Sequence, residues 1–185
     1  MAGHRAVSAD CFVMISGCSG GGKSTLLDEL ARRGHRVVRE PGRRIIADVR
    51  AGRDGALPWD DPAGFARYAM AMAVADHEAA QGLTFFDRGV VDAAVALQAT
   101  AGEAAAAEIA RYRYDLLFFA PPWPEIYEND TDRRHSLEKA LSDHGRVAAA
   151  YRAAGYDPVM LPRDTVAARA DFVIETLRLQ RPTDE

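Results

Sequence analysis

Short apolar runs alternate along the chain with longer segments in which apolar residues recur at helical spacing. Each short run is bounded by Gly, Pro or Asp, which is typical of a buried parallel strand. The runs that we predict as strands are residues 11–16, 36–39, 83–87, 115–120 and 157–161. No internal repeat, glycine- and serine-rich linker or long run of like charges separates them.

The longer segments carry the start and stop signals of helices. Asp61 stands before Pro62, a pairing that favours a helix cap followed by the first helical residue. Gly34 and Gly155 follow two other segments, at the position where helices often end. We predict helices over residues 23–33, 43–50, 62–80, 90–100, 103–111, 136–154 and 165–179. This alternation predicts an α/β fold, with a parallel sheet covered by helices on both faces and ligands bound beyond the carboxyl ends of the strands.

The length and composition of the chain predict a single domain and a cytoplasmic location. The chain has 185 residues, of which 48% are hydrophobic, enough for the core of a single domain spanning 1–185. Its formal net charge is −4, whereas a general nucleic-acid binder needs a surplus of basic residues. No apolar run approaches the roughly 18 to 20 residues that span a bilayer, and the run near the N-terminus is too short for a signal peptide. Cys11 and Cys18 cannot form a disulfide framework, so we expect a soluble cytoplasmic protein that binds neither nucleic acid nor membrane.

The segment after the first predicted strand carries the strongest chemical signal, because it fits the pattern G-x-x-x-x-G-K-[ST] at every fixed position. It consists of Gly17, Cys18, Ser19, Gly20, Gly21, Gly22, Lys23, Ser24 and Thr25. Glycines let backbone N–H groups turn toward phosphate oxygens, and the helix that follows adds its positive end. Lys23 supplies a point charge for the β- and γ-phosphates, and Ser24 supplies a hydroxyl for Mg²⁺. Only Lys23 and Lys139 are lysines among the 23 basic residues, so we interpret the segment as a nucleotide-binding loop rather than a flexible turn with an incidental lysine.

Three further segments resemble those of known phosphotransferases. The guanine-specifying N-K-x-D motif of GTPases is absent. Residues 39–42 (R-E-P-G) and 87–88 (D-R) resemble segments of thymidylate kinases. The overall pattern resembles the AAA-type predicted ATPases, a family similar to the nicotinamide-riboside kinase domain of a bacterial NAD-regulatory protein, through residues 40–43 (E-P-G-R), Asp87 and 113–116 (R-Y-D-L). Arg43 stands where thymidylate kinases usually have a second glycine, and Arg88 follows Asp87 where the riboside-kinase domain has no arginine, so the substrate of neither family is carried over.

The resemblance implies a fold, two cofactors and several site residues. It implies a three-layer α/β/α P-loop NTPase fold, with a five-stranded parallel sheet in the order 2-3-1-4-5, that binds ATP and Mg²⁺. Asp87 would then hold Mg²⁺ together with Ser24, or accept a proton from a substrate hydroxyl. The alternative is that Asp87 caps the next helix. Glu40 would orient or deprotonate the acceptor. The alternative is that Glu40 is an exposed surface residue before a proline turn.

Four arginines complete the candidate site. Arg43 and Arg88 are expected either to contact an anionic substrate or to pair with an acid such as Glu40. Arg133 and Arg134 fall in an expected lid around residues 125–136, where arginines can stabilise charge on the transferring phosphoryl group. Their alternative is a polar loop with ordinary ion pairs.

We therefore expect an ATP- and Mg²⁺-dependent phosphotransferase that acts on a small, possibly nucleoside-like acceptor. Its catalytic residues would be Lys23, Glu40, Asp87, Arg133 and Arg134. Two alternatives stay open. One is an NTPase that uses water as the acceptor, and the other is a non-catalytic module that senses ATP.

Overall fold

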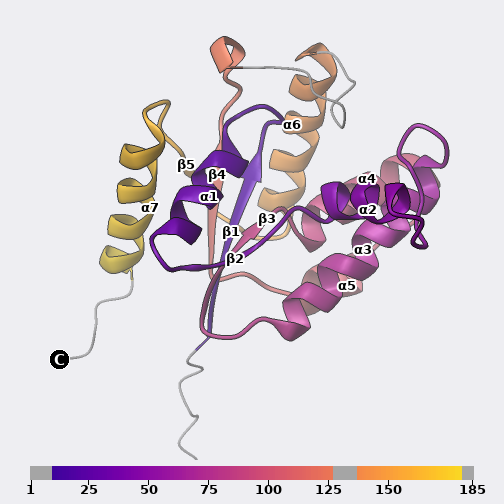
Figure 1. Ribbon diagram of the computed structural model, residues 1–185, viewed down its shortest axis with the longest axis horizontal. Coiled ribbons are helices and arrows are strands. Elements are labelled where there is room, and N and C mark those ends of the chain that lie inside the picture. The colour runs from indigo at the N-terminus through magenta and orange to yellow at the C-terminus, as the bar shows by residue number, and fades with distance from the viewer. Residues whose placement is uncertain (1–9, 127–136, 181–185) are drawn as a thin grey trace, which may run out of the picture.

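A five-stranded parallel sheet lies at the centre of the computed structural model, which describes residues 10–126 and 137–180 (Figure 1). The strands are β1 (Cys11–Gly17), β2 (Arg36–Val38), β3 (Leu83–Asp87), β4 (Leu116–Ala120) and β5 (Val159–Met160). Their spatial order is β2-β3-β1-β4-β5, and every neighbouring pair is parallel. The predicted α/β fold and sheet order are confirmed.

The edge strands are shorter than the sequence pattern predicts. The prediction of a strand over 157–161 is wrong at both ends, since only Val159 and Met160 form β5. Pro158 has no N–H to donate, and an edge strand has a neighbour on one side only. The strand predicted over 36–39 likewise ends one residue earlier, at Val38.

Helices connect the strands and cover both faces of the sheet (Figure 1). They are α1 (Lys23–Arg32), α2 (Pro41–Arg50), α3 (Pro62–Ala79), α4 (Val90–Ala101), α5 (Ala106–Arg111), α6 (Leu137–Ala153) and α7 (Val166–Gln180). A short 3₁₀ helix spans Pro124–Ile126. Two predicted starts are wrong by two residues or more. α2 begins at Pro41 rather than residue 43, because proline fits the first helical position, where its missing N–H is not needed. α5 begins at Ala106 rather than residue 103, since Gly102 has a left-handed φ of 69° and ends α4.

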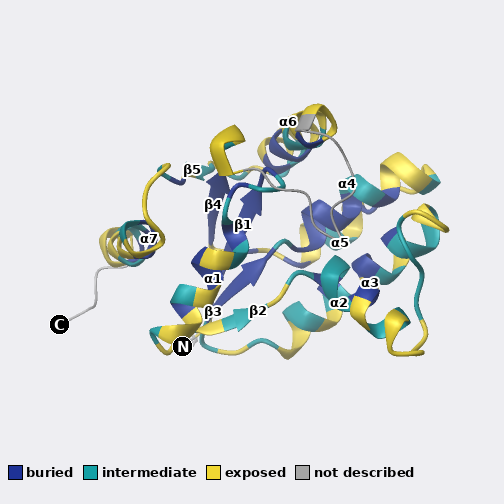
Figure 2. Cartoon of the chain, turned by 45° about the horizontal axis from the view of Figure 1, so that its top comes forward, coloured by how far each residue is buried: buried dark blue, intermediate teal, exposed yellow. Residues whose placement is uncertain are grey.

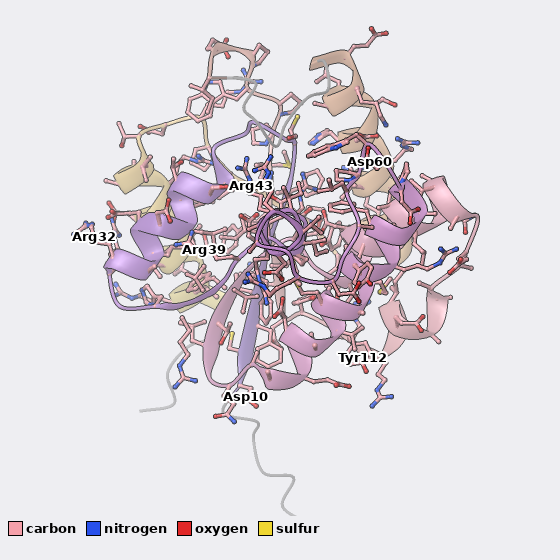
Figure 3. The ribbon with its side chains drawn as sticks, turned by 45° about the vertical axis from the view of Figure 1, so that its right-hand side comes forward. Asp10, Arg32, Arg39, Arg43, Asp60 and Tyr112 are labelled. Atoms are coloured by element: carbon pink, nitrogen blue, oxygen red, sulfur yellow. The ribbon has the colours of Figure 1, made fainter. Side chains whose placement is uncertain are left out.

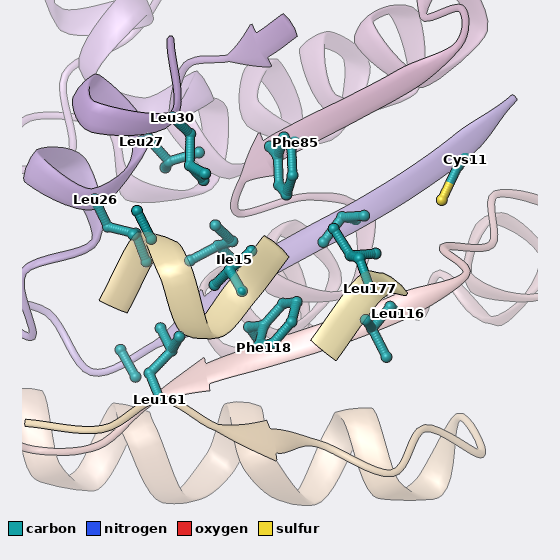
Figure 4. Close-up of a cluster of buried hydrophobic side chains, with 14 residues drawn as sticks. Cys11, Ile15, Leu26, Leu27, Leu30, Phe85, Leu116, Phe118, Leu161 and Leu177 are labelled. Carbon is teal, nitrogen blue, oxygen red and sulfur yellow. The ribbon is translucent and has the colours of Figure 1, made fainter. Parts of the chain in front are cut away.

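The strand side chains alternate between two apolar layers, because successive residues of a strand point to opposite faces. One layer joins the sheet to α1 and α7, and Figure 4 shows it with Leu26, Leu27 and Leu30 of α1 facing Ile15, Phe85 and Phe118. The other layer joins Met14, Phe86 and Phe119 to Val147 and Tyr151 of α6. A third cluster lies among α2, α3 and α4, and Figure 2 shows the central strands buried between these layers.

The register of the strands brings three chain segments to one edge of the sheet. Ile15 lies beside Asp87, and Gly17 lies beside Ala120. The carboxyl ends of β1, β3 and β4 therefore meet there. Figure 3 shows Asp10 at the opposite, amino end of β1 and Arg43 away from it, at the start of α2.

Among the described helices, none combines the length and apolar character that crossing a membrane requires.

Candidate nucleotide-binding site

The glycine-rich segment forms a tight loop between β1 and α1. Gly17 has a φ of 115°, and a Cβ there would lie 2.4 Å from the carbonyl oxygen of Ala120, so only glycine allows β1 to approach β4 this closely. Gly22 has a φ of 69° and immediately precedes α1, which begins at Lys23. The loop therefore lies against the positive end of a helix, an arrangement that suits an anion.

Lys23 folds back across this loop. Its Nζ donates to the carbonyl oxygen of Cys18 across 2.7 Å, and the residue is only 6% exposed. Burial, followed by the positive charge of Arg88, lowers the pKa of Lys23 to about 8. The ammonium group thus still carries its proton at pH 7, next to the backbone that would surround a phosphate.

Asp87 lies at the end of β3 and is 2% exposed. Its Oδ1 is buried and has no hydrogen-bond partner among the described residues. Burial, followed by the nearby carboxylate of Glu40, raises the pKa of Asp87 to about 6. Asp87 does not cap α4: Gly89 occupies the cap position, and its N–H donates to Asp92 across 3.2 Å. The helix-cap alternative is therefore excluded.

Arg88 ties the exit of β3 to three other parts of the site. Its φ of 62° lies in the left-handed region, which is uncommon for a residue with a side chain. Nε lies 3.2 Å from Glu40 Oε1, Nη1 donates to Asp92 Oδ1 across 3.0 Å, and Nη2 donates to the carbonyl oxygen of Gly17 across 3.4 Å. The structure thus pairs Arg88 with two acids and with the loop.

Glu40 stands between two arginines at the start of α2. Its Oε2 lies 3.6 Å from Nε of Arg43, and its Oε1 lies beside Arg88. Arg43 therefore lies at the site, as expected, and contacts the acid that the sequence suggested as its alternative partner. Arg44 pairs with Asp76 of α3 across 2.5 Å instead.

A cavity of about 320 Å³ opens beside the loop. Its lining includes Gly17 of the loop together with Glu40 and Arg88, and most of its wall is apolar. Side chains of α3, α4 and α6 form that wall, including Phe65, Ala69, Ala93, Ala96 and Val147. Helix α6 also contributes polar residues to the lining, namely Lys139, Asp143, His144 and Arg146. Asp87 does not line the cavity, whereas Glu40 does.

Part of the expected lid lies outside the described residues. Arg133 and Arg134 belong to that part, and of the range 125–136 only Glu125 and Ile126 are described. The expected roles of the two arginines stay predictions.

Four buried residues of the site escaped the sequence analysis. Asp92 accepts hydrogen bonds from the hydroxyls of Ser16 and Tyr151, each across 2.6 Å. Arg169 of α7 donates to the carbonyl oxygens of Gly21 and Gly22, each across 3.0 Å. The available signal was a single charge within an otherwise apolar helix face, since Asp92 interrupts the run V-V-D-A-A-V and Arg169 lies on the buried stripe of α7.

Comparison with solved structures shows the same fold in several proteins. The crystal structure of NadR protein in complex with NR has a TM-score of 0.68 and 18% identity, over 92% of this chain and 51% of that one. The chain therefore spans about half the length of that protein. The structure of deoxyadenosine kinase from M. mycoides has a TM-score of 0.60 and 12% identity, over 92% of this chain and 100% of that one. The structure of shikimate kinase from Acinetobacter baumannii has a TM-score of 0.61 and 14% identity, over 92% of this chain and 93% of that one.

The sequence itself matches a family. No curated protein matches it. A sequence model of the AAA_28 family, described as an AAA domain, matches residues 12–169, which include the loop, Glu40, Asp87 and Arg169. With the P-loop between β1 and α1 and the kinase-like sheet order, this match identifies the chain as a member of the AAA_28 family of P-loop NTPases.

Proposed function

We propose that this protein is an ATP-dependent phosphotransferase whose acceptor is a small molecule bearing a hydroxyl or phosphate group. The loop of residues 17–25 holds the triphosphate of ATP, because it combines inward-turned backbone, a helix N-terminus and the buried ammonium group of Lys23. The acceptor occupies the cavity beside that loop.

The cavity is the observation that carries this proposal. Its volume of about 320 Å³ and its apolar wall suit a small organic molecule, whereas an enzyme that transfers phosphate to water has no need of such a space. Glu40 and Arg88 line it together with Gly17 of the loop. Two of the solved structures that share the fold are named as kinases, one of deoxyadenosine and one of shikimate, which supports the same class of reaction.

The residues beside the loop fit a magnesium ion. Mg²⁺ prefers oxygen ligands, and the buried Oδ1 of Asp87 is an oxygen without a hydrogen-bond partner among the described residues. Ser24, in the first turn of α1, offers a hydroxyl oxygen. When bound, the ion neutralises charge on the phosphate oxygens. We assign Asp87 and Ser24 to this role.

Glu40 is left to orient the acceptor, because it lines the cavity and Asp87 does not. In the transfer, the acceptor oxygen forms a bond to the γ-phosphorus while the bond to the β–γ bridging oxygen breaks. Glu40 accepts the acceptor's proton, and ADP is the leaving group. Arg88 holds the Glu40 carboxylate in place, and we propose that Arg133 and Arg134 close over the transferring group as a lid. Closure keeps water from competing with the acceptor.

The test is a thermal-shift screen of nucleosides, nucleotides and small hydroxylated metabolites, with Mg²⁺ and a non-hydrolysable ATP analogue present. We expect some compounds to raise the melting temperature beyond the shift caused by the analogue, and the same compounds to stimulate ADP formation from ATP. Glu40→Gln should lower the stimulated rate and leave binding of the analogue unchanged. If ADP forms at one rate with every compound, and Glu40→Gln does not alter it, water is the acceptor and the proposal fails.

A further inference from the structure

Arg169 occupies an unusual position for a charged side chain. It lies in the first turns of α7, on the same buried stripe as Ala170, Val173 and Leu177, and it is 1% exposed. Burial lowers the pKa of its guanidinium group. An ionised group in such a place destabilises the fold unless other groups compensate for the lost water.

The compensation comes from the nucleotide-binding loop. Nη1 of Arg169 donates to the carbonyl oxygen of Gly22, and Nη2 donates to that of Gly21, each across 3.0 Å. The guanidinium carbon lies 5.5 Å from the centre of the Trp123 ring, within the range of a cation–π contact. None of the ion pairs among residues 10–126 and 137–180 includes Arg169, and its Nε has no hydrogen-bond partner there. Among the described residues, the charge thus contacts the loop without a neutralising acid.

The hydrogen bond to Gly21 fixes the direction of one peptide group. The hydrogen bond to Gly22 reinforces a direction that the backbone N–H of Leu26, across 3.3 Å, and the hydroxyl of Thr25, across 3.0 Å, also hold. In a trans peptide the C=O and the following N–H point in opposite directions, and the structure contains no cis peptide among the described residues. When Arg169 draws the carbonyls of Gly21 and Gly22 toward itself, the N–H groups of Gly22 and Lys23 must point away from it. Those are N–H groups at the start of α1, which have no acceptor within the helix.

Gly22 leaves room for this contact. A Cβ at Gly22 would lie 2.5 Å from Nη1 of Arg169. A larger residue there would therefore displace the guanidinium group from its present place, in addition to the strain at a φ of 69°.

We propose that Arg169 is a positioning residue that presents the N–H groups of Gly22 and Lys23 to the phosphates of the bound nucleotide. The inference rests on the proposed binding of a triphosphate by residues 17–25. The positive charge of Arg169 adds to the attraction of the loop for the anion. Its two hydrogen bonds hold the loop in the binding conformation before the ligand arrives.

Attachment of α7 to the domain does not require this contact. Nη1 of Arg33, which follows α1, lies 2.6 Å from Asp171 Oδ1, and Nη2 donates to the carbonyl oxygen of Ala167. The apolar stripe of α7 also packs on the sheet. A role limited to holding α7 would therefore duplicate existing contacts, whereas no other described side chain donates to the carbonyls of both Gly21 and Gly22.

The experiment compares the full chain with Arg169→Met, Arg169→Lys and Asp171→Asn, using inorganic tripolyphosphate as the probe. Calorimetry gives the dissociation constant, and thermal unfolding gives the melting temperature. Arg169→Met should weaken tripolyphosphate binding by about tenfold or more, because two hydrogen bonds that orient the loop are lost. Arg169→Lys, which keeps the charge and one or two donors, should recover part of the affinity. Asp171→Asn, which loosens α7 without touching the loop, should bind as the wild type does.

The outcomes separate this inference from the proposed function. If the wild-type protein does not bind tripolyphosphate, the assignment of the loop itself fails. If the wild type binds and Arg169→Met binds equally well, or if Asp171→Asn weakens binding as much as Arg169→Met, the positioning role is wrong. Should Arg169→Met not fold, Arg169→Lys decides the question: full affinity in that variant overturns the inference, and reduced affinity with an unchanged melting temperature supports it.

Discussion

The hydroxyl of Tyr151 donates to Oδ2 of Asp92 across 2.6 Å and so joins α6 to α4 beneath the nucleotide-binding loop. The other oxygen of Asp92 accepts from Ser16 of β1 and from Arg88. One buried carboxylate therefore connects the central strand, two helices and the arginine that holds Glu40. The arrangement couples the geometry of the cavity, which α4 and α6 help to line, to that of the sheet.

Loss of this carboxylate should destabilise the protein severely. Asp92→Ala leaves Arg88 and two hydroxyl groups without their acceptor, so we expect the free energy of unfolding to fall by about 3 to 5 kcal/mol. Tyr151→Phe removes one hydrogen bond and should lower it by about 1 to 2 kcal/mol. Chemical denaturation measures both values. As the control, Tyr112→Phe removes a hydroxyl that contacts the half-exposed Glu78 and should change stability less than Tyr151→Phe does. Equal losses in the two tyrosine variants would contradict the central role of Asp92.

Substitution of Lys23 should separate nucleotide binding from folding. Lys23→Met removes the ammonium group from the loop, and we expect affinity for an ATP analogue to fall by about a hundredfold or more, as measured by calorimetry. The melting temperature should stay the same or rise, since burial lowers the pKa of Lys23 and its charge is thus held at a cost in stability. Lys139→Met is the matched control, because it removes the only other lysine of the chain and leaves the loop intact. Unchanged analogue affinity in Lys23→Met would refute the role of the loop.

The stability of the protein in acid should depend on Glu29. Hydrogen bonds from Arg32, followed by those from Arg33, lower the pKa of Glu29 from 4.5 to about 2. A carboxyl group whose pKa is lower in the folded state stabilises the fold above its unfolded pKa, and that stabilisation disappears as the pH falls from 4.5 toward 2. Glu29→Gln should therefore be less stable than the wild type at pH 7, by a modest amount because Arg32 projects into solvent at the end of α1 (Figure 3).

Thermal unfolding between pH 2 and pH 7 tests this expectation. The difference in melting temperature between Glu29→Gln and the wild type should shrink as the pH falls below 4.5. Glu175→Gln, which alters an exposed glutamate on α7, serves as the control. A difference that stays constant across the whole range would show that protonation of Glu29 does not contribute.

Close approach of β1 and β4 should make Gly17 far less replaceable than other glycines with a positive φ. At Gly17 an added Cβ would meet the backbone of Ala120 at 2.4 Å, whereas at Gly34, with a φ of 92°, it would meet nothing within 4 Å. Gly34→Ala should cost about 1 to 2 kcal/mol from its backbone conformation alone. Gly17→Ala should cost more than that, because the two strands must also move apart. Similar losses in both variants, measured by denaturation, would contradict the close approach.

The part of the site that could be predicted most directly is the motif formed by consecutive residues. A loop that wraps phosphate needs its glycines, Lys23 and Ser24 at fixed spacing, so the pattern is visible without any structure. Residues placed at the carboxyl ends of strands, such as Glu40 and Asp87, were found because a parallel sheet brings those ends together.

The parts that could not be predicted depend on tertiary contacts. Arg169 lies 147 residues from Gly22 along the chain, and Ser16 lies 76 residues from Asp92. No local spacing rule links such pairs. Short edge strands and helix starts were also misplaced, since neighbouring elements decide where a strand such as β5 stops.

The central position of β1 has a consequence for how the protein can work. Its hydrogen bonds to β3 and β4 place the loop, Asp87 and the end of β4 on one stiff frame. Part of the cavity wall, in contrast, comes from α3, which packs on α2 and α4, whereas α4 and α6 are tied to β1 through Asp92. A shift of α3 can thus widen or narrow the cavity while the strands that carry the loop keep their places, so the shape of the loop and the width of the cavity depend on separate layers.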